Sequence, residues 1–402
     1  MKILVDIDGF FWPDSIDDEY MQEQRKYISI EREPQPVSSL LEQYYLGFRS
    51  SLFICEDSIE NESEATEALR TFCEACLQSA WSYVQKHITS EQNLPVDFLW
   101  IARSAIIDEL KKEYPEVDNI KLRLSMKPRL SARAFDEETV IFPTLARSVF
   151  NHCNLVIINS FFRAIDDNGQ LVGNIERGQI ARFIFPYLLF CHDDFSVQNL
   201  PIIGAHSQDA FSIAARFTNL QMIFVFAHEY AHILLKHFDK IENSSSYKED
   251  MENDADSLAL KIVSAYAEKS GGVYSENDVF TAIRWLFKYQ LMDDSISTLI
   301  QGKALEFSDS KTENRRVNFQ LELIENHGLT GSTLLDAVGF CMIVELQGIL
   351  HEFGSDLINN IIDIFHESSK TGKVEPWWEQ IKGNEYAISD IIDLFNKPRR
   401  EE

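Results

Sequence analysis

Apolar and polar residues follow one another along most of this chain with the spacing of amphipathic helices. Between residues 62 and 88, for example, Leu69, Phe72 and Cys76 recur at intervals of three and four, which places them on one helical face. The same pattern predicts helices over 37–50, 62–88, 95–114, 175–191, 210–238 and 276–292, a helix from the region of Glu252 to about residue 269, and a helical segment over 331–366. Short apolar or alternating stretches predict strands over 1–8, 119–127, 138–142 and 154–159. We therefore expect an α+β protein that is mostly α, with one small sheet.

The most apolar of these predicted helices carries a chemically distinct group near its end. Residues 221–227 are almost wholly apolar and 233–235 are wholly so, which predicts a buried helix. His228 and His232 stand between them, four residues apart and hence on one face. Their imidazoles can direct two nitrogens at one point about 2 Å from each, which is the geometry of zinc ligands. Glu229 lies beside them, where its carboxylate can take a proton from a water at that point.

A second acidic motif follows at a distance that suits a returning helix. Glu252 comes 20 residues after His232, and the loop-forming run at 243–246 allows one helix to end and the next to run back. Glu252 can then supply a third, carboxylate ligand and leave a fourth position for water. Asp256 lies one turn farther on the same face, where it can accept the second N–H of a ligand histidine and fix its tautomer. Glu249 is an alternative third ligand, but no acid follows it four residues later.

Together the two motifs resemble those of the gluzincins, zinc metallopeptidases in which His-Glu-x-x-His is completed by a Glu on a following helix. The Glu-x-x-Ala-Asp form of 252–256 is similar to the second motif of thermolysin-like and prenyl-endopeptidase-like families. The run Ala-His-Glu-Tyr-Ala-His-Ile-Leu-Leu at 227–235 also resembles the intracellular phage-exclusion (Lit-type) peptidases. The resemblance is confined to the motifs, within residues 222–263. It implies one Zn²⁺ held by His228, His232 and Glu252, with Glu229 as general base.

This resemblance also suggests how the chain is divided. It implies a mainly helical N-terminal region over 1–117, a zincin-like catalytic domain over 118–330 and a C-terminal helical region over 331–402. Within the middle part, residues 160–209 are expected to form an insertion or a lid. Zinc peptidases of this type carry a small sheet before the active-site helix, and an edge strand of that sheet pairs with the substrate backbone. The strands predicted within 119–159 are therefore candidates for the substrate edge.

Other polar residues are candidates for holding an oxyanion or a substrate. Arg316 and Val317, with Arg315 beside them, resemble the Arg-apolar pair that opens a helix in prenyl-endopeptidase-like families, although the preceding His-Pro is absent here. Either arginine can hold a carbonyl oxygen, or the pair can simply begin a charged helix. His192 and His206 precede the motif helix and are either oxyanion donors or ordinary loop histidines.

Other zinc arrangements fit less well. A metzincin would have Gly and a third His three and six residues after His232, where this chain has Leu235 and Phe238. His237 follows His232 by five residues, about 140° around a regular helix. We therefore expect His237 to be a solvated residue of the last helical turn.

Two further short motifs carry less weight. Cys73 and Cys76 form a Cys-x-x-Cys, but they lie in a helical pattern with no second cysteine pair, which favours partly buried helix cysteines. Residues 6–9, Asp-Ile-Asp-Gly, are similar to the nucleophile loop of haloacid-dehalogenase-like phosphatases. The later motifs of that family are missing, which favours a plain strand and turn.

Composition narrows the partners. The net charge of −27 argues against nucleic acid and against an anionic membrane surface, since both are bound by Lys and Arg. It leaves room for a basic protein partner or substrate drawn in by the field. No window of some 18 uninterrupted apolar residues predicts a membrane-spanning helix, and the acidic start does not resemble a secretory signal. Six scattered cysteines form no disulfide framework, which favours the cytoplasm.

The sequence thus predicts a cytoplasmic zinc-dependent endopeptidase that cleaves an intracellular protein or peptide. A role in phage defence or stress is implied by the Lit-type resemblance alone. The alternative is a catalytically inactive zincin-like module that binds or senses, and a helical scaffold without metal is a further alternative. The oligomeric state does not follow from the sequence.

Overall fold

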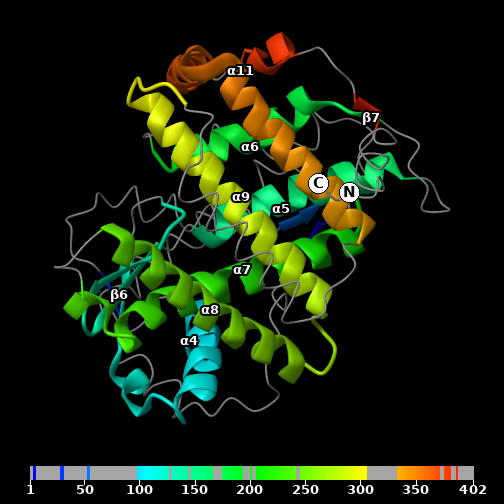
Figure 1. The fold of residues 1–402 in the computed structure, drawn as a ribbon. Helices are drawn as coiled ribbons and strands as arrows, with labels where there is room; N and C mark the ends of the chain where they lie inside the picture. Colours follow the sequence, from blue (N-terminus) through cyan, green and yellow to red (C-terminus); the bar gives the residue numbers. More distant parts are fainter. Residues whose placement is uncertain are drawn as a thin grey trace, which may run out of the picture.

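One long helix, α7 (Gln208–Leu234), runs through the middle of this largely helical protein (Figure 1). The computed structural model describes three short strands, at 3–5, 28–30 and 52–54, and then residues 97–125, 129–143, 146–165, 174–192, 200–201, 205–240, 245–305, 333–371, 375–381 and 386–387. The helix begins where the Oγ of Ser207 accepts a hydrogen bond from the N–H of Ala210, at 3.1 Å, which satisfies one of the free donors of the first turn. Most of its side chains are buried, so it is the core element on which the others pack.

Four helices surround α7. They are α4 (Asp97–Leu110), α5 (Ala146–Ala164), α8 (Ser245–Lys269) and α9 (Glu276–Ile300), and each packs directly on α7. A second layer consists of α6 (Arg177–Phe190) and α11 (Leu334–Thr371), which pack on α5 and on each other. The short turns η3 (Pro115–Asn119), η5 (His237–Lys240) and η6 (Trp377–Ile381) connect or cover these helices. α7 is therefore held from several sides along its length.

A small mixed sheet packs beside the C-terminal part of α7. Its order is β2 (Ile28–Ile30), β4 (Lys121–Ser125), β6 (Thr139–Pro143) and β5 (Arg133–Asp136). The first three strands run parallel, and β5 is antiparallel to β6. Every residue of β6 is buried, and the ring of Phe142 stacks on that of Phe226 of α7 with centroids 4.1 Å apart. β5 forms an edge of this described sheet, and most of it is exposed.

Two strand pairs lie outside this sheet. β1 (Ile3–Val5) pairs with β3 (Leu52–Ile54), and β7 (Asn174–Ile175) pairs with β8 (Tyr386–Ala387), both antiparallel. The second pair links the region before α6 to a segment near the end of the chain.

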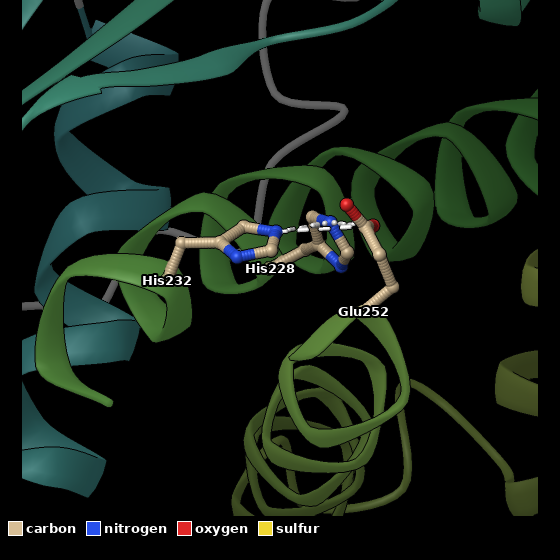
Figure 2. A group of neighbouring side chains, drawn as sticks. All are labelled: His228, His232 and Glu252. Atoms are coloured by element: carbon tan, nitrogen blue, oxygen red, sulfur yellow. Dashed lines mark hydrogen bonds and ion pairs between the residues drawn. The ribbon is translucent and has the colours of Figure 1, made fainter. Parts of the chain in front are cut away.

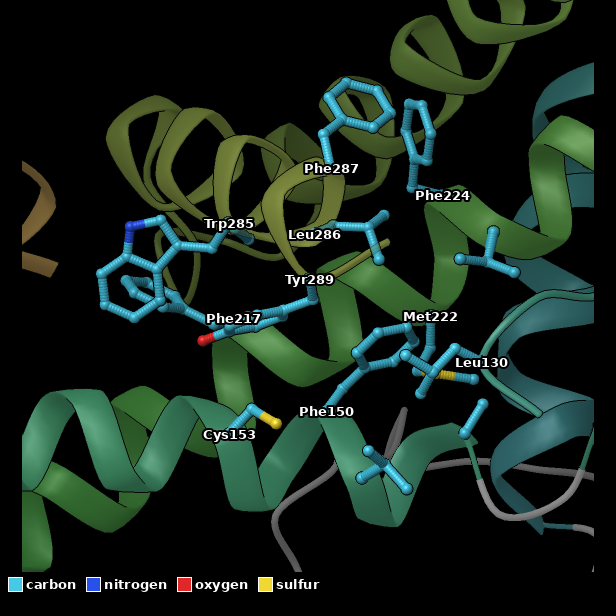
Figure 3. Packing of buried hydrophobic residues seen from close by; sticks show 14 of the residues in the cluster. Leu130, Phe150, Cys153, Phe217, Met222, Phe224, Trp285, Leu286, Phe287 and Tyr289 are labelled. Carbon is cyan, nitrogen blue, oxygen red and sulfur yellow. The ribbon is translucent and has the colours of Figure 1, made fainter. Parts of the chain in front are cut away.

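The aromatic core fixes α7 against α5 and α9 (Figure 3). Phe150 of α5 stacks on Tyr289 of α9 at 6.4 Å, and Phe217 of α7 meets Trp285 of α9 edge to face at 5.3 Å. Burial of each such ring contributes about 2 kcal/mol of transfer free energy. On the other side of Trp285, α11 approaches so closely that a Cβ on Gly339 would lie 2.0 Å from the indole ring. Only glycine fits at that crossing.

The helical pattern in the sequence predicted most described helices. The predictions over 95–114, 175–191, 210–238 and 276–292, the helix from Glu252 to about 269, and the segment over 331–366 are confirmed by α4, α6, α7, α9, α8 and α11 respectively. Those over 37–50 and 62–88 lie outside the described residues. The segment over 331–366 is two helices joined at Gly354, whose φ of 58° interrupts the regular conformation.

The strand predictions had a mixed outcome. Those over 119–127 and 138–142 are confirmed by β4 and β6, and β1 lies within 1–8. The strand predicted over 154–159 is wrong, because those residues belong to α5. The run is apolar on all sides because α5 is buried between other helices. A run of this kind shows neither the 3.6-residue period of an amphipathic helix nor the two-residue period of a strand, so its conformation cannot be predicted from the pattern. The strand β5 was not predicted. The fold class, α+β and mostly α, holds for the described residues; the division at 117/118 and 330/331 stays a prediction.

Two helices, α7 and α11, are long and apolar enough to cross a membrane by length and composition alone. In α7, 83% of the apolar window is buried inside the protein, so its apolarity is explained by its place in the core. In α11 the buried share is 44%. The expectations of no membrane-spanning helix and of no membrane partner therefore stay predictions.

Candidate metal centre

The three predicted ligands converge where α7 and α8 lie side by side (Figure 2). The Nε2 atoms of His228 and His232 are 3.1 Å apart. Oε2 of Glu252 on α8 lies 3.4 Å from Nε2 of His228 and 3.8 Å from Nε2 of His232. All three side chains are partly buried, with Glu252 the most exposed at 26%. The helix α7 supplies two ligand atoms because the histidines are one turn apart, and α8 brings the third from outside that helix.

These separations suit a tetrahedral metal ion. Ligand atoms at about 2.0–2.1 Å from a tetrahedral centre lie roughly 3.3–3.4 Å from one another. The three observed separations, 3.1, 3.4 and 3.8 Å, scatter around that value. In addition, two imidazole nitrogens that face each other at 3.1 Å repel through their lone pairs unless a proton or a cation lies between them. This group of atoms can therefore hold a metal ion.

Asp256 stands behind one of the two histidines. Its Oδ1 lies 2.7 Å from Nδ1 of His228, and only 2% of its side chain is exposed. The sequence placed Asp256 one helical turn after Glu252, and the structure brings both carboxylates to the same imidazole, one at each nitrogen. A carboxylate at Nδ1 holds the proton there and leaves the Nε2 lone pair for a metal.

The electrostatic field of the cluster favours a cation. Burial opposes a charge on His228, but Asp256 and Glu252 outweigh it and raise the pKa of His228 to about 10. Burial, together with the neighbouring His228, lowers the pKa of His232 to about 4. One imidazole thus takes up a proton readily while its neighbour resists one. The carboxylates that stabilise this proton would stabilise a divalent cation at the same point.

Glu229 directs its carboxylate toward the sheet. Its Oε2 accepts a hydrogen bond from the backbone N–H of Ala134 in β5, at 2.6 Å. Burial raises the pKa of Glu229, while His228 and the N–H of Ala134 act in the opposite direction without cancelling the rise. A carboxyl group with a raised pKa is a better proton acceptor than an ordinary one. The motif predicted the position of Glu229 on α7, but nothing in the sequence indicated that β5 would reach it.

His237 is the clearest correction at the site. It was expected to be solvated, yet it is 3% exposed, and its Nδ1 lies 2.8 Å from Nδ1 of His232. The reason is that α7 ends at Leu234 and Lys236 has φ 55°. This left-handed residue turns the chain back, so the angle calculated for a continuous helix does not apply. Only the local spacing of His237 hinted at the contact.

A buried arginine of α4 lies close to the motif turn of α7. Arg103 of α4 is fully buried, and its Nη2 donates a hydrogen bond to the carbonyl of Asp118 at 2.8 Å. Burial raises the pKa of the Tyr230 hydroxyl, and the charge of the neighbouring Arg103 opposes that rise. Tyr230 lies between the two ligand histidines in sequence. Arg103 therefore links α4, η3 and the motif turn of α7, a role that the sequence did not reveal.

The remaining predicted site residues are not brought to this cluster. Arg315 and Arg316 lie outside the described residues, as do the side chain of Glu249 and the cysteines at 73 and 76. Nε2 of His192 lies 2.7 Å from Oδ1 of Asp293 of α9, and His206 stacks on Phe162 with ring centroids 6.2 Å apart. Both histidines thus have partners away from the three converging ligands.

Comparison of the chain with protein-family models, with curated proteins and with solved structures finds no match.

Proposed function

We propose that this protein is a zinc-dependent endopeptidase that hydrolyses a peptide bond of an intracellular protein or peptide. The observation that carries the proposal is the convergence of three ligand atoms: two imidazole nitrogens lie 3.1 Å apart, and a carboxylate oxygen lies 3.4 and 3.8 Å from them. A second carboxylate, that of Glu229, is held by the backbone N–H of Ala134. A purely structural metal site closes its fourth position with protein, whereas a catalytic site leaves it to water or substrate.

The donor set favours zinc over the common alternatives. Two imidazoles and one carboxylate, held at tetrahedral separations, match the preference of Zn²⁺. Calcium and magnesium prefer six or more oxygen ligands, and the described residues group only one carboxylate with the two histidines. When bound here, the ion would supply a polarised water and a Lewis acid for the substrate carbonyl.

Glu229 is the residue that moves the proton in this proposal. Its carboxylate takes a proton from the attacking water and delivers it to the nitrogen of the leaving amine. Both steps require a base that is held in place and whose pKa lies above that of an ordinary carboxyl group. The hydrogen bond from Ala134 and the burial of Glu229 support these two requirements.

The edge of the small sheet is the proposed substrate platform. β5 is antiparallel to β6 at one edge of the described sheet, and the N–H of Ala134 points away from β6 toward Glu229. An extended peptide that adds to this edge as a further strand would pass directly beside Glu229. Arg133 and Phe135 are exposed on the same strand, Phe135 by 49%, and can contact substrate side chains. The substrate edge is therefore assigned to β5 rather than to either strand that the sequence predicted correctly.

Replacing Glu229 by Gln is the decisive experiment. The change keeps the size of the side chain and removes its basicity, so zinc should stay bound while peptide cleavage falls by about 10²–10⁴-fold. New protein N-termini are compared by mass spectrometry in cell lysates that receive purified wild type, Glu229→Gln or buffer. Zinc content is measured on the same samples, purified without a metal-binding tag.

The outcomes separate the proposal from its alternatives. N-termini that appear with wild type and not with Glu229→Gln, at equal zinc content, support the endopeptidase. Zinc in both proteins but no cleavage by either would instead support the inactive binding or sensor module. Protein without zinc would leave only a helical scaffold.

The biological role is a separate part of the proposal. A function in phage defence or stress is supported by the Lit-type motif resemblance alone, and it requires that cleavage be restricted to very few proteins. Equal digestion of many unfolded peptides in the lysate experiment would contradict that role while leaving the enzyme activity intact.

A further inference from the structure

The second imidazole of the site has a partner of its own. His232 directs Nε2 toward His228 and Glu252 and Nδ1 toward His237. The two Nδ1 atoms are 2.8 Å apart, and the two rings are tilted by 70° with centroids 5.0 Å apart. This separation is that of a well-formed hydrogen bond. The contact therefore fixes both the position and the rotation of the His232 ring.

The donor in this hydrogen bond follows from the tautomer that a ligand must have. A neutral imidazole carries a proton on one nitrogen and a lone pair on the other. When Nε2 of His232 offers its lone pair to a metal, the proton lies on Nδ1, which then donates to Nδ1 of His237. His237 accepts through that atom and carries its own proton on Nε2. The pair thus selects one tautomer of each ring.

We propose that His237 is a positioning residue that holds His232 in the orientation and tautomer needed to bind the metal ion, as Asp256 does for His228. The inference rests on the metal site of the proposed function. The two ligand histidines then have the same arrangement, because each directs Nε2 into the site and Nδ1 toward a buried partner. The partners differ in charge, since one is a carboxylate and the other is an imidazole.

The backbone gives independent support. Lys236 adopts φ 55°, a left-handed conformation that costs a non-glycine residue about 1 kcal/mol. Glycine is the usual residue at this position after a helix. The strained turn directs the first residue of η5 inward, and that residue is His237, which is 3% exposed. Strain of this kind persists only where the surrounding contacts hold it in place.

A pair of nearly isosteric substitutions tests the proposal. In His237→Asn the side chain keeps an acceptor close to the position of Nδ1, whereas His237→Leu has the same branching and no acceptor. The zinc dissociation constant is measured by competition with a chromophoric chelator, and the visible spectrum is recorded with Co²⁺ in place of zinc. We expect His237→Leu to bind zinc about 10–100-fold more weakly and His237→Asn to stay within about threefold of wild type.

The control variant is His206→Leu, which removes a histidine just before α7, at the opposite end of the helix from His228 and His232. It should leave zinc affinity and the Co²⁺ spectrum unchanged. Thermal unfolding of all four proteins without metal shows whether a variant has lost its fold. If His237→Leu does not fold, the comparison of His237→Asn with His237→Ser is used instead, since Ser is too short to reach Nδ1 of His232.

The possible results separate this inference from the proposed function. Zinc bound equally by wild type and His237→Leu would overturn the role of His237 and leave the metal site standing. Equal loss in His237→Leu and His237→Asn would also overturn it, because the hydrogen-bond acceptor would not be what matters. Wild-type protein that binds no zinc would overturn both proposals.

Discussion

The two halves of α7 both bury polar side chains, but they use them differently. In the first half, Thr218 and Gln221 face Asn154 of α5. The amide of Asn154 donates to both, at 2.9 Å each, and Nε2 of Gln221 donates to the carbonyl of Ala282 of α9 at 3.0 Å. The hydroxyl of Tyr289 donates to Asn154 at 3.2 Å. These hydrogen bonds join three helices, and every one of them runs between protein groups.

In the second half, the polar atoms meet at a point instead of forming pairs. The Nε2 atoms of His228 and His232 face each other and Oε2 of Glu252. The two Nε2 atoms, 3.1 Å apart, can share at most one proton, and Oε2 of Glu252 lies 3.4 and 3.8 Å from them, beyond the usual length of a hydrogen bond. Behind them, however, both Nδ1 atoms have close partners in Asp256 and His237.

The comparison distinguishes a structural polar cluster from a site. Burying the polar groups of either cluster costs free energy, and in the first cluster the hydrogen bonds among its own groups offset that cost. The second brings two imidazole nitrogens and a carboxylate oxygen together at one point, where the group could hold a metal ion, and Asp256 and His237 contact the two imidazoles from behind. A cluster of this second kind is a sign of function, because converging ligand atoms whose rings are held from behind are the arrangement that a metal ion needs.

The largest expected effect is on metal binding. Glu252→Gln removes one ligand of three without changing the size of the side chain. Structural zinc sites gain about 10–16 kcal/mol from their ligands, so one ligand contributes roughly 4 kcal/mol, which is about a thousandfold in affinity. We expect zinc affinity to fall by that order, as measured by chelator competition.

The same variant should lose the stabilisation that zinc gives. At a hundred times the dissociation constant, bound zinc would stabilise wild type by about 2.7 kcal/mol, which thermal unfolding would detect as a rise in Tm. Glu252→Gln should show no rise at that zinc concentration and a similar Tm without metal. A full response in the variant would mean that the second half of α7 is structural like the first.

A smaller effect is expected from the first half. Gln221→Leu keeps the volume of the side chain but removes one hydrogen-bond partner of the carbonyl of Ala282 and one of the amide of Asn154, so that a buried N–H of Asn154 is left unsatisfied. Each unsatisfied buried group costs about 1–3 kcal/mol, so the free energy of unfolding should fall by about 2 kcal/mol in urea. Zinc affinity should not change, because the substituted residue lies two turns before the first ligand. A large loss of zinc affinity with unchanged stability would reverse the assignment of the two halves.

This difference also explains how far the sequence could be interpreted. His228, His232 and Glu252 were predictable because helix periodicity fixes the first two and a turn plus a return helix supplies the third. The spacing of residues along regular helices is sufficient to predict a site whose side chains all come from such helices. Asp256 followed for the same reason, since it is one turn from Glu252 on α8.

The residues that were missed depend on irregular or long-range structure. His237 follows a single left-handed residue, and no periodicity describes the direction of the chain after it. Ala134 reaches Glu229 through the pairing of β5 with β6, which joins residues far apart in the sequence. The buried run at 154–159 was assigned to a strand because a segment buried on all sides shows no face.

A third class of polar residue lies at the surface, and it should have the smallest effect. His192, at the end of α6, lies 2.7 Å from Asp293 of α9, and the two side chains are 22% and 18% exposed. Unlike the two clusters of α7, this pair consists of one histidine and one carboxylate near water. Burial lowers the pKa of His192, but the hydrogen bond and charge of Asp293, with Asp294 nearby, raise it by more.

The sign of the pH dependence follows from this raised pKa. The folded protein holds the proton of His192 more tightly than the unfolded chain does, so the stabilisation is complete below the unfolded pKa of about 6.5. It is lost as the pH rises through the higher pKa of the folded state. In urea unfolding, wild type should lose about 1 kcal/mol more than His192→Ala between pH 6 and pH 9. Asp293→Asn should flatten the profile in the same way, because it removes the other half of the pair. If both variants keep the wild-type slope, the pH dependence must originate in other groups, and the His192–Asp293 contact contributes no more than an ordinary surface ion pair.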